Sequence, residues 1–168
     1  GIVHNDVKPG NILLHNGNVK IADFGKARNL ANLGRVTKGT RRYTSPEMAR
    51  ASLNGDRKCE DFSAAVDIWA LGATLYQLLE CHFPYEDAND DTVLEAIANQ
   101  GLKLSDNESY SVKVKTFFSL MTAIDPKERA SADALCTNSF LAQACTCSEL
   151  DEIIKVKKMW KEQQGQHE

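Results

Sequence analysis

A tight turn near the N-terminus constrains this chain more than any other short feature. Two β-prone runs, residues 11–14 and 19–22, flank a turn that contains Asn16-Gly17. Asn-Gly between apolar runs is the strongest local signal for a β-hairpin, because both residues tolerate the positive φ angles of such turns. A loop with an aspartate, Asp6, precedes the first run, and another, with Asp23, follows the second. If the strands pair, both loops lie at the same end of the hairpin and the two aspartates share one site.

The apolar pattern after the hairpin predicts a mainly helical domain. Residues 26–60 contain few periodic apolar positions, so we expect a long irregular segment, which in compact domains is usually functional or mobile. From Phe62 to Leu79, apolar residues recur at helical spacing around much of the circumference, which predicts a buried central helix. Periodicity predicts further helices at about 91–99, 110–122, 131–138 and 148–163.

Capping residues mark the ends of three of these helices. Residues 90–91 and Gly101 bracket the first, and Ser131 can cap the third. Ser148-x-x-Asp151 opens the last helix as a capping box. An apolar stripe along that helix fits either packing on the domain or docking of a partner. It consists of Leu150, Ile153, Ile154 and Trp160.

Composition excludes several classes of partner. The chain has 168 residues, 42% hydrophobic and 26% charged, which suits one compact domain. Charges interrupt every long apolar stretch, so no membrane-spanning segment is predicted. The net charge of −3 argues against a globally basic nucleic-acid binder, although residues 26–50 carry +6 and residues 51–110 carry −9. We therefore expect neither nucleic acid nor membrane as a partner.

The cysteines predict reduced thiols rather than a disulfide framework. They number five, at irregular spacing, which fits an intracellular and most simply cytoplasmic protein, with the nucleus as a further possibility. Cys145-Thr146-Cys147 lacks the second ligand pair that a structural zinc site needs.

Three short motifs occur in an order that carries chemistry. Residues 4–11 read His-Asn-Asp-Val-Lys-Pro-Gly-Asn, residues 23–25 read Asp-Phe-Gly, and residues 45–47 read Ser-Pro-Glu. Each is weak evidence alone. In this order, with a hairpin between the first two, they resemble the catalytic signature of eukaryotic serine/threonine protein kinases, in which an aspartate is followed at this spacing by an asparagine.

Further matches extend the resemblance over residues 1–142. They are Gly39-Thr40 ahead of Tyr43, Asp67-x-Trp69-x-x-Gly72, and Arg129 after Asp125-Pro126. The resemblance implies a mainly α fold with a small β-hairpin, the C-terminal lobe of a kinase domain, with residues 143–168 as a helical extension. It also implies ATP and Mg²⁺ as cofactors and a protein with serine or threonine hydroxyls as substrate.

The resemblance assigns catalytic and binding roles residue by residue. Asp6 matches the aspartate that accepts the proton of the substrate hydroxyl, and Lys8 matches the lysine that touches the transferring phosphate. Asn11 and Asp23 match the Mg²⁺ ligands, and together with Lys8 they form the nucleotide site. Thr40 matches the hydroxyl that bridges the catalytic aspartate and lysine in serine/threonine kinases.

A second set of matches is structural. Glu47 and Arg129 resemble a buried ion pair that anchors the end of the activation segment. Asp67 resembles the helix aspartate that holds the catalytic loop through backbone hydrogen bonds. His4 braces the loop rather than acting as a base, and Trp69 and Gly72 are expected to serve packing.

Several positions depart from the family pattern. Asn5 stands where many kinases carry an arginine that pairs with a phosphorylated activation loop. Thr37 occupies a position suited to such a phosphosite, although an exposed loop hydroxyl is the simpler reading. Gly10 and Gln77 stand where kinases that prefer basic peptides often carry carboxylates. The cations expected near Thr37 to receive phosphate are Arg35, Lys38, Arg41 and Arg42.

Elements of the nucleotide-covering half of a kinase are not found in this sequence. There is no Gly-rich phosphate loop, strand lysine or partner glutamate helix, and the chain begins close to His4. We therefore expect a partial catalytic domain without its N-terminal lobe, inactive in isolation. Two functions stay open: a serine/threonine protein kinase, and a kinase-like or pseudokinase module that binds partners without catalysis.

Overall fold

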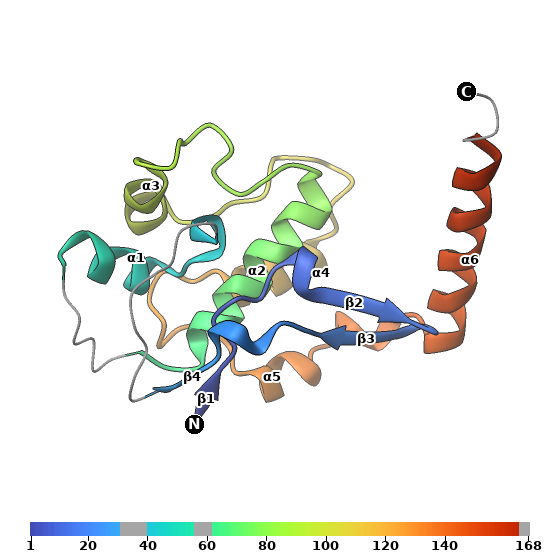
Figure 1. Cartoon of the computed structure of the whole chain (residues 1–168), viewed down its shortest axis with the longest axis horizontal. Coiled ribbons are helices and arrows are strands. Elements are labelled where there is room, and N and C mark those ends of the chain that lie inside the picture. Colours follow the sequence, from blue (N-terminus) through green and yellow to red (C-terminus); the bar gives the residue numbers. More distant parts are fainter. Residues whose placement is uncertain (31–39, 56–61, 165–168) are drawn as a thin grey trace.

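The described strands lie in the N-terminal part of the chain, and the α-helices follow them. A computed structural model describes residues 1–30, 40–55 and 62–164. The strands are β1 (Ile2–Val3), β2 (Ile12–His15), β3 (Asn18–Ile21) and β4 (Arg28–Asn29). The α-helices are α1 (Pro46–Leu53), α2 (Ala65–Glu80), α3 (Val93–Gln100), α4 (Val112–Met121), α5 (Ala132–Cys136) and α6 (Cys147–Gln164) (Figure 1).

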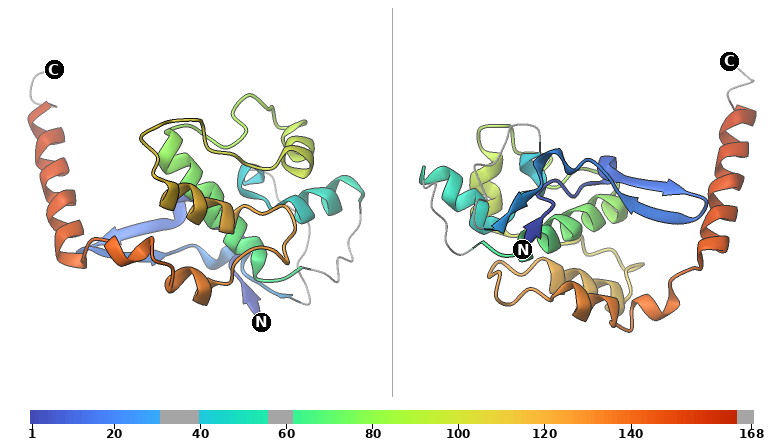
Figure 2. Two further views of the ribbon diagram at one scale, coloured as in Figure 1. Left: turned by 180° about the vertical axis from the view of Figure 1, so that it is seen from behind. Right: turned by 60° about the horizontal axis from the view of Figure 1, so that its bottom comes forward.

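Helix α2 runs through the middle of the molecule. The β2–β3 hairpin lies along one side of it, and α4 lies on the side away from the hairpin (Figures 1 and 2). Helices α1 and α3 pack against each other at one end. Helix α6 stands apart at the other end, beyond the hairpin turn. No helix in the described ranges is long and apolar enough to cross a membrane.

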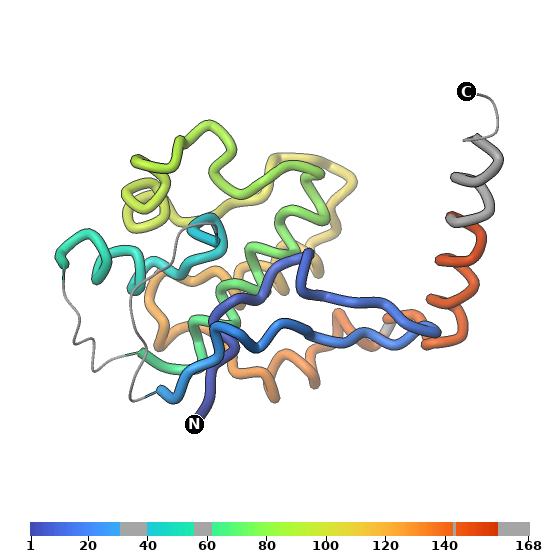
Figure 3. Tube along the Cα trace, in the orientation of Figure 1, coloured from blue at the N-terminus to red at the C-terminus, as the bar shows by residue number. Residues whose placement is uncertain are grey.

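The predicted hairpin is confirmed. Strands β2 and β3 are antiparallel, with Ile12 opposite Ile21 at the open end and His15 opposite Asn18 at the turn. Asn16 and Gly17 have φ angles of 48° and 71°, the left-handed region that the Asn-Gly pair predicts. The open end of the hairpin lies beside α2, and its turn points toward the start of α6 (Figure 3).

A second antiparallel pair, β1 with β4, was not predicted. It pairs Ile2 with Asn29 and Val3 with Arg28. A two-residue strand has no periodicity of its own, so this pair exists only because the chain returns past its own N-terminus. It fixes the segment after Phe24 beside the segment that leads into the loop of residues 4–8.

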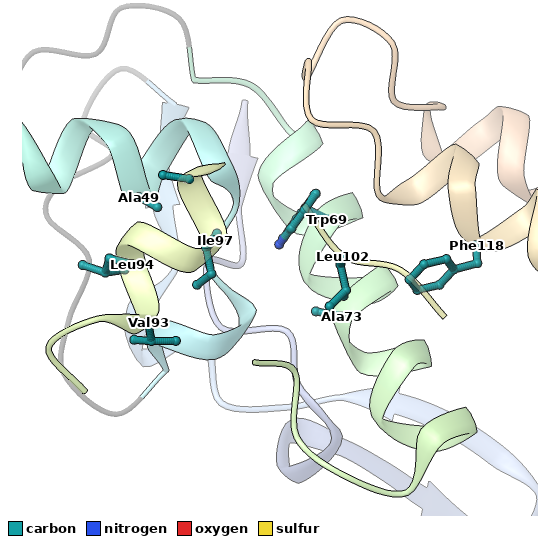
Figure 4. Close-up of a cluster of buried hydrophobic side chains, with 9 residues drawn as sticks. Ala49, Trp69, Ala73, Val93, Leu94, Ile97, Leu102 and Phe118 are labelled. Atoms are coloured by element: carbon teal, nitrogen blue, oxygen red, sulfur yellow. The ribbon is translucent and has the colours of Figure 1, made fainter. Parts of the chain in front are cut away.

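The main core gathers side chains from four helices around Trp69, which is fully buried (Figure 4). Helix α2 supplies Trp69 and Ala73, α1 supplies Ala49, and α4 supplies Phe118. Helix α3 and the segment after it contribute Val93, Leu94, Ile97, Ala98 and Leu102. The predicted buried central helix is confirmed, beginning at Ala65 rather than Phe62.

The prediction of a wholly irregular segment over residues 26–60 was wrong, because α1 forms within it. Helix α1 begins at Pro46, a residue favoured in the first turn, and buries Met48, Ala49 and Ala51. Two alanines in the buried face give a weak apolar signal, so packing against α3 rather than periodicity determines this helix. Residues 31–39 and 56–61 lie outside the described residues.

Two predicted caps are confirmed, but the prediction that residues 90–91 cap α3 was wrong, because Thr92 precedes the helix and Asn89 Oδ1 accepts the Thr92 N–H. Ser131 Oγ accepts a hydrogen bond from the Ala134 N–H, and Gly101 ends α3 with φ of 65°. The capping box of α6 lies two residues earlier than predicted. Glu149 Oε2 accepts from the Thr146 N–H at 2.7 Å, and these backbone and hydroxyl hydrogen bonds lower the pKa of Glu149.

Helix α6 leaves part of its apolar stripe uncovered. Ile153 is 50% exposed, whereas Leu150 and Ile154 are partly buried, and the Trp160 side chain lies outside the described residues. The start of the helix sits on the hairpin turn. A Cβ at Gly17 would lie 1.7 Å from the Cys147 carbonyl oxygen, so only glycine permits this approach.

Gly72 allows α2 and α4 to approach closely. A Cβ at this position would lie 2.7 Å from Thr122 Cγ2 and 3.1 Å from Met121 Cβ. Overpacking costs about 1–3 kcal/mol and the gain in helix propensity returns about 1 kcal/mol, so we expect Gly72→Ala to lower the free energy of unfolding by up to about 2 kcal/mol. Urea denaturation measures this change. Gly10→Ala, whose Cβ would meet no atom closer than 4.0 Å, is the control, and a Gly72→Ala variant as stable as the parent would contradict the prediction.

Candidate functional site

The loop of residues 4–8 is held against α2 by one carboxylate. Asp67, near the start of α2, accepts the His4 N–H on Oδ2 at 2.7 Å and the Asn5 N–H on Oδ1 at 2.8 Å. Both oxygens are therefore used to hold backbone, which fixes the path of the chain immediately before Asp6.

His4 joins this loop to the segment after the hairpin. Its Nδ1 accepts the Asp6 N–H at 3.3 Å, so Nε2 carries the proton and donates to the Ala22 carbonyl oxygen at 3.1 Å. The His4 ring also meets the Phe24 ring edge-on, with centroids 4.8 Å apart. The Ala22 N–H donates to the Asn11 carbonyl oxygen at 2.8 Å. These contacts bring the two aspartate-bearing loops together at one end of the hairpin.

The Asp6 carboxylate lies at the centre of this site and is 4% exposed. Its Oδ2 is 3.2 Å from Lys8 Nζ, 3.1 Å from Lys26 Nζ and 3.2 Å from Asn11 Nδ2. Its Oδ1 is buried and has no hydrogen-bond partner within the described ranges. One oxygen is thus fixed by two ammonium groups and an amide, while the other is an unused acceptor.

Asn11 supplies an oxygen donor beside Asp6, and Asp23 supplies another from the segment between Ala22 and Phe24, which contact His4. Asn11 is buried and uses its side-chain N–H groups on the Asp6 backbone and carboxylate, at 2.9 Å and 3.2 Å, which leaves its amide oxygen as a ligand. Asp23 is exposed, has φ of 62°, and accepts the Gly25 N–H on Oδ1 at 3.2 Å. An amide oxygen and a carboxylate are hard donors of the kind that Mg²⁺ takes from proteins, so the residues present fit that ion. The described residues contain no group of three or more His, Cys, Asp and Glu side chains arranged for a metal.

Thr40 reaches the site through a different lysine from the one that the resemblance implied. Its Oγ1 accepts from Lys26 Nζ at 2.9 Å, and no hydrogen bond joins it to Lys8 or Asp6 in the described part of the chain. Lys26 takes the place expected for Lys8 because of the path of residues 23–27. The 3-10 helix η2 (Phe24–Lys26) places Lys26 over the Asp6 carboxylate.

Lys26 is the site residue that sequence reasoning missed. It follows directly after Asp-Phe-Gly, and its position beside the motif was the only available signal. A single lysine in a segment with seven cations over residues 26–50 is by default a solvated charge. Only the folded chain shows that its ammonium points inward.

Glu47 and Arg129 form a buried ion pair between α1 and the segment after α4. Two hydrogen bonds of 2.7 Å and 2.6 Å join the guanidinium to the Glu47 carboxylate, and the Arg129 side chain is fully buried. Its other N–H groups donate to the carbonyl oxygens of Ala65, Ala123 and Ile124. The guanidinium also lies 5.1 Å from the centre of the Trp69 ring. This pair connects α1, α2 and the segment after α4.

Asn5 has a backbone conformation that suits its residue type. Its φ is 61°, in the left-handed region where asparagine is enriched among residues with a side chain. The Asn5 N–H is used on Asp67 at 2.8 Å, so this conformation is held in place.

The two arginines in the segment before α1 donate hydrogen bonds to backbone carbonyl oxygens. The Arg42 guanidinium donates to the carbonyl oxygens of Pro84, Tyr85 and Ala88, and Arg41 donates to that of Asp90. These hydrogen bonds tie the segment to the loop after α2, while Arg41 Nε has no partner in the described residues, and the expectation that the two arginines receive a phosphate stays a prediction. Thr37, Arg35 and Lys38 lie outside the described residues.

The Gln77 side chain accepts a hydrogen bond from Tyr43. The Tyr43 hydroxyl donates to Gln77 Oε1, and burial raises the pKa of Tyr43, with Arg42 opposing this rise. Tyr85, which donates to the Gly101 carbonyl oxygen at 2.8 Å, has its pKa raised by burial as well. Both hydroxyls therefore remain protonated donors: Tyr43 ties the segment before α1 to α2, and Tyr85 ties the loop after α2 to the end of α3.

Comparison with known proteins agrees with this arrangement. The family model described as "Protein kinase domain" matches residues 1–141. Serine/threonine-protein kinase CST20 of Candida albicans is 34% identical over 166 residues, which is 96% of this chain and 13% of that protein. Serine/threonine-protein kinase KIC1 of Saccharomyces cerevisiae is 36% identical over 159 residues, 91% of this chain and 14% of that protein.

A third relative covers the chain to a similar extent. Serine/threonine-protein kinase shk2 of Schizosaccharomyces pombe is 36% identical over 162 residues, 94% of this chain and 26% of that protein. The chain thus spans roughly a quarter or less of the length of these curated relatives. The match to the domain covers most of the chain, and Lys8 and Asn11 of the first motif meet the buried Asp6 carboxylate. The chain therefore belongs to the protein kinase domain family.

Proposed function

We propose that this chain supplies the phosphoryl-transfer half of a serine/threonine protein kinase, which moves the γ-phosphate of ATP to serine or threonine hydroxyls of a protein. Residues 1–142 would form the C-terminal lobe of the kinase domain and residues 143–168 a helical extension. Membership of the family and the serine/threonine kinase activity for which the relatives are named support this proposal. The four cysteines in the described ranges are free, in keeping with an intracellular and most simply cytoplasmic protein.

The observation that carries the proposal is the state of the Asp6 carboxylate. Phosphoryl transfer requires that the enzyme orient the hydroxyl and neutralise charge, with little covalent chemistry of its own. Asp6 Oδ2 is fixed by Lys8, Lys26 and Asn11, whereas Oδ1 is an acceptor without a partner in the described structure. A serine or threonine hydroxyl would donate to Oδ1 and pass its proton there as its oxygen bonds to phosphorus and ADP leaves.

The remaining site residues would neutralise the negative charge of the phosphates, either directly or through Mg²⁺. Asn11 and Asp23 would hold Mg²⁺ through an amide and a carboxylate oxygen. When bound, the ion neutralises charge on the phosphates. Lys8, with its side chain 27% exposed, lies at the mouth of the site, where its ammonium can reach the transferring phosphate. Serine/threonine selectivity rests on the match of Lys8 and Thr40 to that class.

The hairpin offers the surface for the nucleotide-covering half of the domain. Large apolar side chains are exposed on one face of the hairpin, where Leu14, 51% exposed, pairs with Val19, 56% exposed, and Ile21 on the same face is 49% exposed. Phe24, next to the hairpin, is 64% exposed. A contiguous apolar surface of this kind marks an interface, and it lies beside the Asp6 site. We propose that an N-terminal kinase lobe covers it and closes the nucleotide site.

Phosphate transfer tests the proposal directly. The longest natural protein that contains this chain is incubated with γ-labelled ATP, Mg²⁺ and a mixture of acceptor proteins, and the labelled amino acids are identified. We expect label on serine and threonine. Asn11→Ala should raise the Mg²⁺ concentration for half-maximal rate by about 10- to 100-fold, because it removes an oxygen donor. Asn99→Ala, on the exposed side of α3, is the matched control.

Two results would overturn the proposal. The first is label on tyrosine alone. The second is the absence of transfer from a folded protein at any Mg²⁺ concentration, which would favour a kinase-like module that binds partners without catalysis.

A further inference from the structure

Lys26 links two residues that the proposed reaction uses. Its Nζ lies 3.1 Å from Asp6 Oδ2 and donates to Thr40 Oγ1 at 2.9 Å. Asp6 and Thr40 are 4% and 9% exposed, and they come from segments far apart in the sequence. The ammonium group is therefore a direct bridge between the catalytic loop and the segment that leads into α1.

Lys8 does not provide the same bridge. Its Nζ lies 3.2 Å from Asp6 Oδ2, and it has no contact with Thr40 within the ranges that the structure describes. If Lys26 were absent, Lys8 would be the one described lysine left at Asp6. Lys8 makes no hydrogen bond to Thr40 in the described residues.

The local backbone holds Lys26 in this place. Asp23 Oδ1 accepts the Gly25 N–H at 3.2 Å, and the Ala27 N–H donates to the Phe24 carbonyl oxygen at 2.9 Å, closing the turn. Strand β4 follows at once and pairs with β1. The Lys26 side chain leaves a turn fixed at both ends, so its ammonium can bridge at a modest entropic cost.

We propose that Lys26 is a positioning residue for phosphate transfer, which ties the Asp6 carboxylate to Thr40 so that the catalytic loop and the segment before α1 act as one unit. This inference rests on the proposed kinase function. The two ammonium groups carry one positive charge more than the Asp6 carboxylate that they contact, which favours the approach of an anionic phosphate to Asp6.

Steady-state kinetics of the longest natural protein that contains this chain test the inference. Lys26→Met should lower kcat by about 10- to 100-fold, because a misplaced carboxylate no longer orients the hydroxyl. The KM for ATP should change by less than about threefold, since Lys26 acts on Asp6 rather than on nucleotide binding. Lys26→Arg should restore part of the rate. Lys113→Met, on the exposed face of α4, is the control.

A double-mutant cycle shows whether Lys26 acts through Thr40. Thr40→Val should lower kcat, and the double variant should be no slower than the slower single variant, because both remove the same bridge. Additive effects would overturn the bridging role. A Lys26→Met enzyme with the parent kcat would overturn the inference as a whole, provided that Asp6→Asn abolishes transfer. If Asp6→Asn stayed active, Asp6 would lose its proposed role and this inference its premise, whereas absence of transfer by the parent protein would overturn the kinase proposal.

Hydrogen exchange gives a readout that does not depend on activity. The N–H groups of Tyr43 and Thr44 donate to the Thr40 and Arg41 carbonyl oxygens at 3.2 Å and 3.0 Å, in the turn that Thr40 begins. Lys26→Met should speed exchange of these two amides by about 10-fold, with exchange in α2 unchanged. Unaltered exchange at both amides would contradict the bridge.

Discussion

Asp6→Asn should lower the rate of phosphate transfer by about 10²- to 10⁴-fold, the range expected when a positioned acid or base is lost. The amide has nearly the shape of the carboxylate, so the surrounding packing is retained. It cannot take up the proton of a serine or threonine hydroxyl, and it no longer pairs with the ammonium groups of Lys8 and Lys26, 3.2 Å and 3.1 Å away. Initial rates at saturating ATP and Mg²⁺ measure the effect.

The control for this prediction is a charge change away from the site. Asp106→Asn removes an exposed carboxylate from the loop before α4 and should leave the rate within about twofold. Circular dichroism and thermal unfolding show whether Asp6→Asn is folded. A folded Asp6→Asn protein with more than about a tenth of the parent rate would remove Asp6 from the proposed role.

Arg129→Met should lower the free energy of unfolding by about 3–5 kcal/mol, the cost of stranding one member of a buried ion pair. The substitution leaves the Glu47 carboxylate, whose side chain is 13% exposed, without its two guanidinium hydrogen bonds. It also removes the donors to the carbonyl oxygens of Ala65, Ala123 and Ile124. Denaturant unfolding followed by circular dichroism measures the loss.

Two further variants separate the ion pair from general packing. Glu47→Gln combined with Arg129→Met should be less destabilised than Arg129→Met alone, because no unpaired charge remains buried. Lys155→Met breaks the exposed pair with Asp151 in α6 and should change stability by no more than about 0.5 kcal/mol. A loss of unfolding free energy below about 1 kcal/mol for Arg129→Met would show that the buried pair does not anchor α1 to α2 and the segment after α4.

Local sequence signals predicted the parts of the fold that depend on local physics. The Asn16-Gly17 turn forms because these two residues adopt positive φ at little cost, whatever surrounds them. Helices α2 and α4 follow from apolar periodicity, and Ser131 caps α5 through its own side chain. Helix α1 escaped prediction because its buried face is mostly alanine and is stabilised by α3.

The sequence by itself determined the hairpin, the order of the motifs and the family, because turn chemistry and motif spacing are properties of neighbouring residues. Only the tertiary structure decided that β1 pairs with β4 and that Arg42 donates hydrogen bonds to the loop after α2. It also decided that Lys26 rather than Lys8 reaches Thr40. Each of these contacts joins segments distant in the chain. Their geometry depends on how the whole backbone packs, and no local pattern encodes it.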